Sequence, residues 1–423
     1  MKKLHALNGG VNDAIGSLHH ILSLILFRIK NKEVNMQFNK IRFLSFLVTT
    51  IFLLSIVSCA PKPRKEVSAL DTPEHHVFSG NKLLDKGKYD DAKREFELAI
   101  SLDPKFSSAH AGLGLVYGSQ KNFDKGYDSL KDAKSYAKTK EDKVNANVFM
   151  LRLLSMERKG NWLDKTEDEF KDAVKLDPGA SAAYYYMGKA YKVSYDFDKA
   201  GEMFKKVLDL NTKYVNEASE EWALVQKIQL AAPGSLIGKK IALIDEITRA
   251  DIAALFIQEL ELEKLFKKRT PKQFDTSFQA PTQKMETEKM VKMEAATDIK
   301  DHVLKTDIDT VMELMLKGLE SYPDHTFQPD KKITRAEYAI MIEDILIKVS
   351  GDEKLATKFI GEKSPFPDLR NDLPYFNAVM VVTTRGVMKA KDLTTGEFGA
   401  MDAISGADSL LIIRKLKDEL RFF

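Results

Sequence analysis

Apolar residues between positions 73 and 230 recur with the spacing of amphipathic helices, and the pattern repeats after 34 residues. The segments GKYDDAKREFELAISLDP and DFDKAGEMFKKVLDLN share one arrangement of Ala and Phe positions. A short amphipathic helix buries its apolar face only against neighbours, so such a repeat predicts a stack of helical pairs. The repeats are expected to begin near residues 73, 107, 147 and 181, with about six residues inserted around 138–143.

Recurring small and aromatic residues explain the pattern as packing. A glycine costs roughly 1 kcal/mol in a helix, so its return at one phase of the repeat indicates a steric demand. This pattern resembles the tetratricopeptide repeat, which implies an α-solenoid over residues 73–230, closed by a helix over residues 217–230 around Trp222. The third repeat departs from it, with Leu154 in place of the glycine.

The resemblance implies a concave face that binds an extended peptide or another protein. Carried over to this chain, that face includes Asn81, Leu84, Leu115, Tyr185 and Lys189. The family's Lys and Asn pattern for carboxylate binding is not reproduced, so no class of peptide is predicted. A scaffold without a dedicated ligand is the alternative.

A second, longer repeat occupies the C-terminal part of the chain. Its closing segments read ITRADIAALFIQEL at 247–260, ITRAEYAIMIEDIL at 333–346 and ISGADSLLIIRKL at 404–416. Thr334 with Glu337, and Thr248 with Asp251, have the spacing of a helix-capping box. These segments resemble the S-layer homology domain, which implies a mostly helical three-repeat bundle over residues 235–420. The first copy has no clear opening motif unless the helix around Trp222 serves.

The same resemblance implies sites for anionic cell-wall polysaccharide, formed by Arg249 and Arg335 with Asp298 and Asp368. A guanidinium suits a carboxylate because it donates two parallel hydrogen bonds. The alternative is that each arginine pairs with a carboxylate of a neighbouring repeat and binds nothing. The third copy has Ser405-Gly406 where Thr-Arg is usual.

Between the first two copies, residues 264–297 are rich in Lys, Gln, Thr and Pro. That composition predicts a partly disordered insertion. A loop that docks on the bundle is the alternative.

Residues 36–59 have the layout of a secretory signal peptide, with basic residues ahead of an apolar stretch. Ile56-Val57-Ser58-Cys59 resembles the bacterial lipobox, which implies cleavage before Cys59 and lipid attachment to it. A plain signal peptide or an uncleaved anchor is the alternative. Residues 1–35 fit poorly ahead of such a signal, so Met36 is the expected start. Residues 59–72, rich in Pro and charge, are expected to be a flexible tether.

Ala60 follows the cysteine where an inner-membrane retention signal resembles Asp. In a Gram-negative cell this favours the outer membrane, facing the periplasm. Basic and acidic side chains number 65 and 62, which gives no reason to expect nucleic acid as a partner. One cysteine excludes an internal disulfide and cysteine-based zinc sites.

No Ser/His/Asp set, metal cluster or cofactor motif stands out in the sequence. The overall prediction is a non-enzymatic envelope lipoprotein that links a membrane to peptidoglycan or a wall polymer and recruits protein partners. The alternative is a scaffold lipoprotein that assists envelope assembly or secretion, with repeats that no longer bind polysaccharide.

Overall fold

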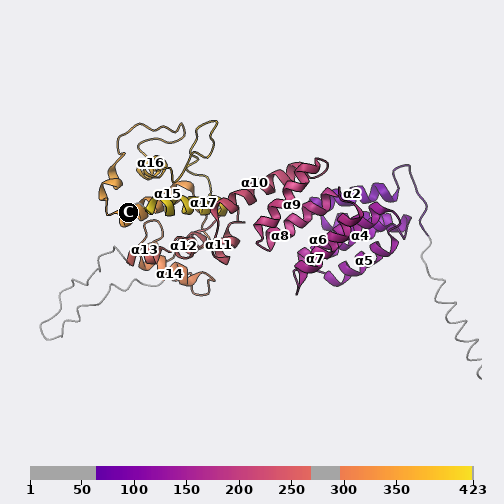
Figure 1. Ribbon diagram of the computed structural model, residues 1–423. Coiled ribbons are helices and arrows are strands. Elements are labelled where there is room, and N and C mark those ends of the chain that lie inside the picture. Colours follow the sequence, from indigo (N-terminus) through magenta and orange to yellow (C-terminus); the bar gives the residue numbers. More distant parts are fainter. Residues whose placement is uncertain (1–62, 268–295, 422–423) are drawn as a thin grey trace, which may run out of the picture. The chain divides into compact units, whose positions relative to one another are not determined.

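The computed structural model describes residues 63–267 and 296–421 (Figure 1). These residues form helices and turns, and the described ranges contain no β-strand beyond two isolated bridges. The predicted all-α class is confirmed. Cys59 and most of the predicted insertion lie outside the described residues. Within the described ranges, no helix has the length and apolar character needed to cross a membrane.

The chain divides into two units, of which the smaller takes in residues up to His75 together with Leu98–Pro104. In this unit the Arg64 guanidinium donates to both carboxylate oxygens of Asp71, at 2.7 and 2.6 Å. The Arg64 backbone N–H also donates to the Ser101 carbonyl at 2.7 Å. Part of the predicted tether is therefore held by hydrogen bonds.

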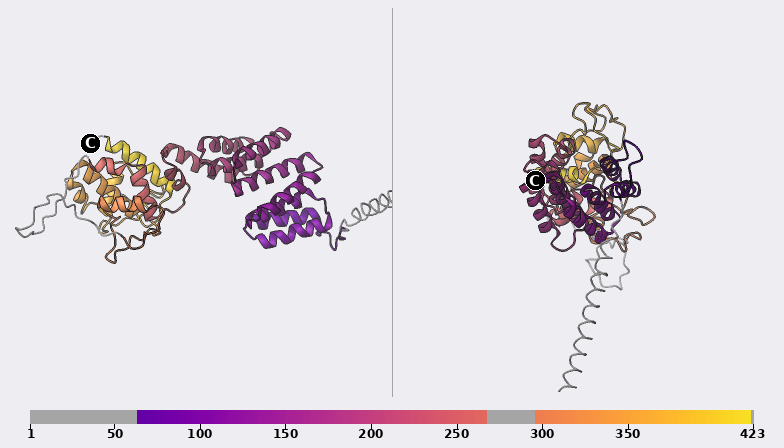
Figure 2. Two further views of the ribbon diagram at one scale, coloured as in Figure 1. Left: turned by 90° about the horizontal axis from the view of Figure 1, so that it is seen from below. Right: turned by 90° about the vertical axis from the view of Figure 1, so that its right-hand side faces the viewer.

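Residues from Pro73 to Ala231 form helices that follow one another in antiparallel pairs (Figures 1 and 2). In the larger unit α4 pairs with α5, α6 with α7 and α8 with α9, and α4, α6 and α8 contact one another in sequence. The helices are α2 (Pro73–Asp85), α3 (Tyr89–Leu102), α4 (Ser107–Ser119), α5 (Phe123–Tyr136), α6 (Lys140–Glu157), α7 (Trp162–Leu176), α8 (Ser181–Val193), α9 (Phe197–Leu210) and α10 (Val215–Ala231).

Three of the four predicted repeat starts coincide with the first residues of α2, α4 and α8. The third differs, because α6 begins at Lys140 rather than near residue 147. Thr139 and Asp142 form a capping box there, so the inserted residues extend the helix at its N-terminus.

Phe96 shows why glycine recurs in the repeats. Its ring is fully buried between Gly80 of the same repeat and Gly112 of the next. A Cβ atom on Gly80 would lie 2.7 Å from the ring, and one on Gly112 would lie 2.2 Å from it. Gly188 and Phe204 repeat this arrangement, with a distance of 2.7 Å. The steric demand predicted from the sequence is therefore present.

The C-terminal bundle is organised by three equivalent isoleucines, one at the start of each closing segment. The Ile247 N–H donates to the Ile404 carbonyl, Ile404 donates to Ile333, and Ile333 donates to Ile247, at 3.1, 3.2 and 3.1 Å. The hydrogen bonds form a closed ring, and all three side chains are buried. The helices of the bundle are α11 (Leu236–Ile241), α12 (Arg249–Gln258), α13 (Leu262–Lys267), α14 (Lys305–Glu313), α15 (Arg335–Ser350), the 3-10 helix η1 (Glu353–Thr357), α16 (Phe376–Thr384) and α17 (Gly406–Leu420).

Helix α10 belongs to both parts of the larger unit. Each closing helix of the bundle packs against the opening helix of the next repeat, as α12 does with α14 and α15 with α16. The corresponding partner of α17 is α10, which also packs against α9 of the array. The helix around Trp222 thus occupies the position of the missing opening helix of the first copy.

Gly406 occupies the position that the other two copies give to arginine. Its N–H donates to the Ile244 carbonyl at 2.8 Å. A Cβ atom at this position would lie 1.7 Å from the carbonyl oxygen of Ile241, in α11. Backbone of the first repeat therefore fills the space that a side chain would need.

Replacing Gly406 by alanine should lower the free energy of unfolding by more than about 2 kcal/mol, because α11 must move. Gly201→Ala in α9 is the matched control, since the nearest atom to its Cβ position is 3.4 Å away. That change should be neutral or stabilise by up to about 1 kcal/mol. Urea unfolding of both variants measures the effect, and equal stability of the two would contradict the close approach.

Candidate functional site

Arg249 reaches from the first repeat of the bundle to the loop Gly318–Phe327 of the second, and we call this contact the first junction. It is 4% exposed. Its Nε donates to the Phe327 carbonyl at 2.8 Å, and its two terminal nitrogens donate to the carbonyls of Gly318 and Glu320 at 2.6 and 2.9 Å. The Tyr322 ring lies 4.9 Å from its guanidinium carbon. The side chain is therefore surrounded by the loop of the second repeat.

Arg335 makes the equivalent contact at the second junction, but with fewer bonds. Its Nε donates to the Phe398 carbonyl at 2.8 Å and Nη2 donates to the Lys389 carbonyl at 2.6 Å. It is 9% exposed. Burial is the main cause that lowers the pKa of both Arg249 and Arg335.

The two predicted aspartates hold the same loops from the other side. Asp298 accepts from the backbone N–H groups of Phe327 and Gln328, both at 2.7 Å. Asp368 accepts from Phe398 and Gly399 at 2.8 and 2.7 Å. Both aspartates are exposed residues, in contrast to the arginines.

The structure thus brings each predicted arginine and aspartate together around one phenylalanine, Phe327 or Phe398. The arginines bond to backbone carbonyls of the neighbouring repeat, whereas the alternative reading expected carboxylates. Whether these residues bind a polymer stays a prediction. At the third junction Gly406 contacts α11 directly, as described above.

Sequence reasoning missed the side chains that distinguish the first two junctions. The loops Gly318–Phe327 and Lys389–Phe398 have equal length and place equivalent carbonyls on the arginines. Tyr322 in the first loop corresponds to Leu393 in the second. Aligning the two loops on their phenylalanines would have shown this difference.

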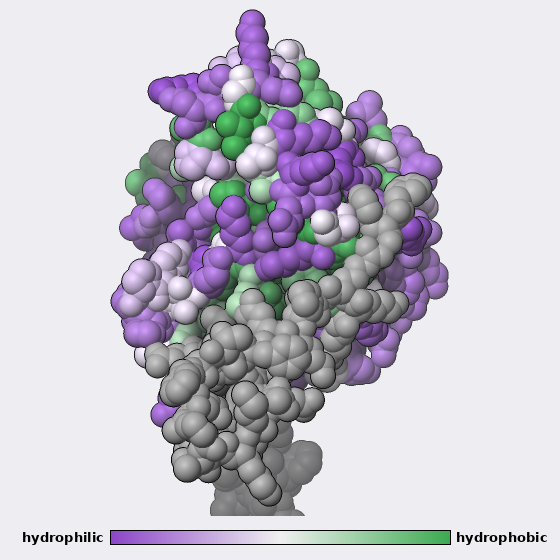
Figure 3. Space-filling view, turned by 90° about the vertical axis from the view of Figure 1, so that its left-hand side faces the viewer, coloured by the Kyte–Doolittle hydropathy of each residue, from purple (hydrophilic) through white to green (hydrophobic). Residues whose placement is uncertain are grey.

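The surface of the larger unit that Figure 3 shows is largely hydrophilic. Polar and charged side chains separate its apolar areas into small patches.

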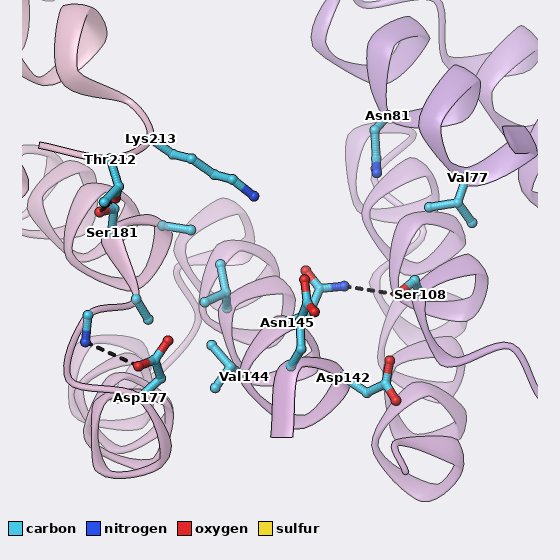
Figure 4. A pocket seen from close by; sticks show the side chains of 15 residues that line it. Val77, Asn81, Ser108, Asp142, Val144, Asn145, Asp177, Ser181, Thr212 and Lys213 are labelled. Carbon is cyan, nitrogen blue, oxygen red and sulfur yellow. Dashed lines mark hydrogen bonds between the residues drawn. The ribbon is translucent and has the colours of Figure 1, made fainter. Parts of the chain in front are cut away.

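The repeat array has a pocket of about 430 Å³ at the N-terminal ends of α4, α6 and α8 (Figure 4). The predicted face residue Asn81 lines it, and Asn145 donates to the Ser108 hydroxyl at 3.4 Å within it. The lining is mixed, with the carboxylates of Asp142 and Asp177 and the Lys213 ammonium among polar and small apolar groups.

The remaining predicted face residues differ in exposure. Leu84, Leu115 and Tyr185 are buried, at 8%, 1% and 8% exposed, so they pack within the array and present little surface. Lys189 is half-buried, and its ammonium lies 5.6 Å from the Tyr185 ring centre. Burial lowers the pKa of Lys189.

Arg152 lies beside this lysine and was missed from the sequence. Its guanidinium lies 4.2 Å from the ring centre of Tyr186 and 5.1 Å from that of Phe149. Its field also lowers the pKa of Lys189, after burial and the field of Lys192. Lys189, Arg152 and Tyr186 form a polar, aromatic surface on α6 and α8.

Comparison with known proteins identifies both kinds of repeat. A model of the TPR repeat matches residues 80–121, and the model of the S-layer homology domain matches residues 319–339. The predicted families, in the predicted order, are therefore confirmed. Human tetratricopeptide repeat protein 6 is 29% identical over 141 residues, which cover 33% of this chain and 26% of that protein. The chain thus matches about a quarter of that relative's length.

Among solved structures, one described as a functional characterization of Pseudomonas aeruginosa pilF is 17% identical and has a TM-score of 0.29. The match covers 46% of this chain and 92% of the chain in that structure. The TPR protein YrrB, described as having an unusual peptide-binding site, is 18% identical with a TM-score of 0.17. The match covers 34% of this chain and 91% of the YrrB chain.

The two families set the class of function. TPR repeats suggest interaction with other proteins, and the S-layer homology domain suggests binding to the cell wall and association with the cell envelope. Both are scaffold or binding modules rather than catalytic ones. Within the described ranges, no group of three or more His, Cys, Asp or Glu side chains is placed to hold a metal ion.

Replacing each junction arginine by lysine tests the bonding described above. Lysine keeps the charge, but one ammonium cannot replace a fork that reaches several carbonyls. Arg249→Lys should cost about 2–3 kcal/mol of unfolding free energy, and Arg335→Lys about 1 kcal/mol less, because Arg249 has one more bond. Chemical denaturation measures both, and a larger loss for Arg335→Lys would contradict the assignment.

Proposed function

We propose that this protein is a non-enzymatic lipoprotein that links a membrane to the cell wall and recruits protein partners. The observation that carries the proposal is the order of its parts. A lone cysteine in a lipobox-like segment precedes a TPR array, which precedes an S-layer homology bundle. Each part supplies one attachment, to lipid, to protein and to wall polymer.

The lipid attachment is assigned to Cys59. Acyl chains contribute roughly 0.8 kcal/mol per buried methylene group, so two or more chains anchor a protein stably. Bacterial lipoproteins of the kind this segment resembles carry three. The outer membrane, with the folded part in the periplasm, is the proposed location, on the strength of Ala60 after the cysteine.

The wall attachment is assigned to the junctions of the bundle. Arg249 and Arg335 supply positive charge beneath the loops, and Asp298 and Asp368 fix the shape of those loops by accepting two N–H groups each. An anionic peptidoglycan or wall polysaccharide is the ligand that suits this charge.

The protein attachment is assigned to the surface of α6 and α8 with the adjoining pocket. Lys189, Arg152 and Tyr186 offer charged and aromatic contacts of the kind that dominate protein interfaces. Asn81 and Asn145 in the pocket offer amide groups that can bond to an extended backbone.

The second candidate is a scaffold lipoprotein for envelope assembly or secretion, in which the bundle no longer binds polysaccharide. The burial of Arg249, with its three bonds to carbonyls, favours it. Each of the three guanidinium nitrogens already donates one bond, so two of the five N–H groups remain for a ligand.

Cys59→Ser tests the lipid anchor. The variant should leave the described helices folded, because they do not include residue 59, and should move from the membrane fraction to the soluble fraction. Cell fractionation with circular dichroism of the purified protein measures both. A variant that remains in the membrane fraction would show that the lipid anchor is wrongly assigned.

Co-sedimentation with purified peptidoglycan sacculi separates the two candidates. The native protein should be retained, and retention should weaken as salt rises, because exposed charges are screened. Arg335→Ala should lose retention, provided that circular dichroism shows its helices intact. Absence of retention in the native protein would reject wall binding and leave the scaffold candidate.

A further inference from the structure

We infer that the Arg335 junction is the anion-binding site of the described bundle, and that Lys389 and Lys415 bind carboxylate or phosphate groups of the wall polymer there. The inference rests on the proposed wall binding and narrows it to one of three junctions. It follows from differences between junctions that the repeat pattern makes equivalent.

The first junction is covered by its own loop. Tyr322 lies over the Arg249 guanidinium, and its hydroxyl accepts from the Lys331 ammonium at 3.1 Å. Lys331 in turn forms an ion pair with Glu337 at 2.9 Å. The charge of Lys331 is therefore already paired, and all three guanidinium nitrogens of Arg249 already donate to carbonyls.

The second junction lacks this cover. Leu393, the counterpart of Tyr322, is 81% exposed and so does not lie over Arg335. Arg335 also bonds to one carbonyl fewer than Arg249, and its Nη1 donates to none of the described residues. A buried guanidinium with a remaining donor is a suitable contact for an oxyanion.

The two loops differ in charge. The first, residues 318–327, carries the carboxylates of Glu320 and Asp324 and no lysine or arginine, whereas the second, residues 389–398, carries Lys389 and Lys391 besides Asp392 and Glu397. Glu320 of the first loop corresponds to Lys391 of the second, and Gly318 corresponds to Lys389. The field at Arg249 includes the carboxylates of Glu337, Glu320 and Asp298.

The carboxylates near Arg335 all have partners already. Asp402 pairs with Lys391 at 2.7 Å, and Asp408 pairs with Lys227 at 2.7 Å. Asp368 accepts two backbone N–H groups. None of these carboxylates forms an ion pair with Lys389 or Lys415.

Lys415 of α17 is partly buried, and it lies one helical turn before Glu419, which pairs with Arg385 four residues ahead of Lys389. Burial lowers the pKa of Lys415, and the positive charge of Lys389 lowers it further. Neither ammonium forms an ion pair with a residue of the described ranges. Two neighbouring ammonium groups without an ion-pair partner repel each other, so an oxyanion bound between them would reduce that repulsion and could accept two charge-assisted bonds.

The third junction has no room for a ligand group at the corresponding position. Gly406 replaces the arginine, and the α11 backbone lies where its side chain would be. One junction therefore remains open, basic and incompletely bonded.

The test uses the full-length protein and co-sedimentation with purified sacculi over a range of protein concentrations. Lys389→Gln with Lys415→Gln should weaken the apparent affinity by about tenfold or more, since two charge-assisted contacts are lost. The double replacement by arginine, which keeps both charges, should restore binding to near the native value. These residues are not in the core, so circular dichroism should be unchanged.

The control removes two lysines at the first junction, Lys331 and Lys317, which directly precedes Gly318, by Lys317→Gln with Lys331→Gln. It should leave the affinity within about twofold, because Lys331 is already paired and Arg249 is covered. Equal losses in the two double variants, or no loss at Lys389 and Lys415, would overturn the inference while wall binding itself stood. Native protein that does not sediment would instead refute the proposed function.

Treating the sacculi with hydrofluoric acid, which cleaves phosphodiesters, distinguishes the two sources of oxyanion. Retention that depends on Lys389 and Lys415 and survives the treatment assigns the site to carboxylates of the wall. Retention that is lost assigns it to a phosphate-linked polymer. Either result supports an oxyanion site, whereas retention that is unaffected by loss of both lysines contradicts it.

Discussion

The ring of backbone hydrogen bonds among Ile247, Ile333 and Ile404 sets the geometry of the whole bundle. Each bond joins one repeat to the next, so the ring closes only when all three closing segments meet at the same level. The residue two positions on from each isoleucine then reaches the next repeat in turn. Arg249 and Arg335 enter loops, and Gly406 meets a backbone. The positions of all three junctions therefore follow from the ring of hydrogen bonds.

A bundle of three repeats also needs three opening helices. The first of them is α10, which is at the same time the last helix of the repeat array. Helix α10 packs on α9 and on α17, and one continuous core of buried side chains runs from Met187 of the array to Leu416 of the bundle. Cores that share a helix unfold together more readily than domains joined by a linker. The repeat array and the bundle of the larger unit are accordingly coupled by packing.

Short-range sequence patterns, such as helix-capping boxes and the spacing of glycine and aromatic residues, predicted most of this fold. The capping boxes at Thr248 and Thr334 form as their spacing indicated, and the glycine and aromatic pattern produces the contact of Gly80 with Phe96. The start of α6 differs from the prediction because an inserted stretch can lengthen a helix as well as form a loop. Sequence spacing alone does not distinguish these two outcomes.

The sites were harder to predict because their chemistry depends on contacts between distant residues. Arg249 meets carbonyls about 70 residues further along the chain, at Gly318 and Glu320, and no local pattern shows that its donors are engaged. Leu84 and Leu115 lie at positions expected to line a face, yet both are buried by packing within the array. Burial is set by the stack as a whole, so periodicity gives the helix but not the depth of each side chain.

The three junctions of the bundle differ in how open they are to a ligand, and this difference would affect how tightly the bundle binds a wall polymer. Three equal sites on a polymer would gain from one another, because each bound site raises the local concentration of ligand at the others. With only one open junction, the bundle does not benefit from this raised local concentration. A second attachment, such as a lipid on Cys59, would restore it, since a membrane-tethered bundle searches only the wall within reach of its tether. The difference between Tyr322 and Leu393, small as it is in sequence, would then make the proposed anchor and the proposed wall site depend on each other.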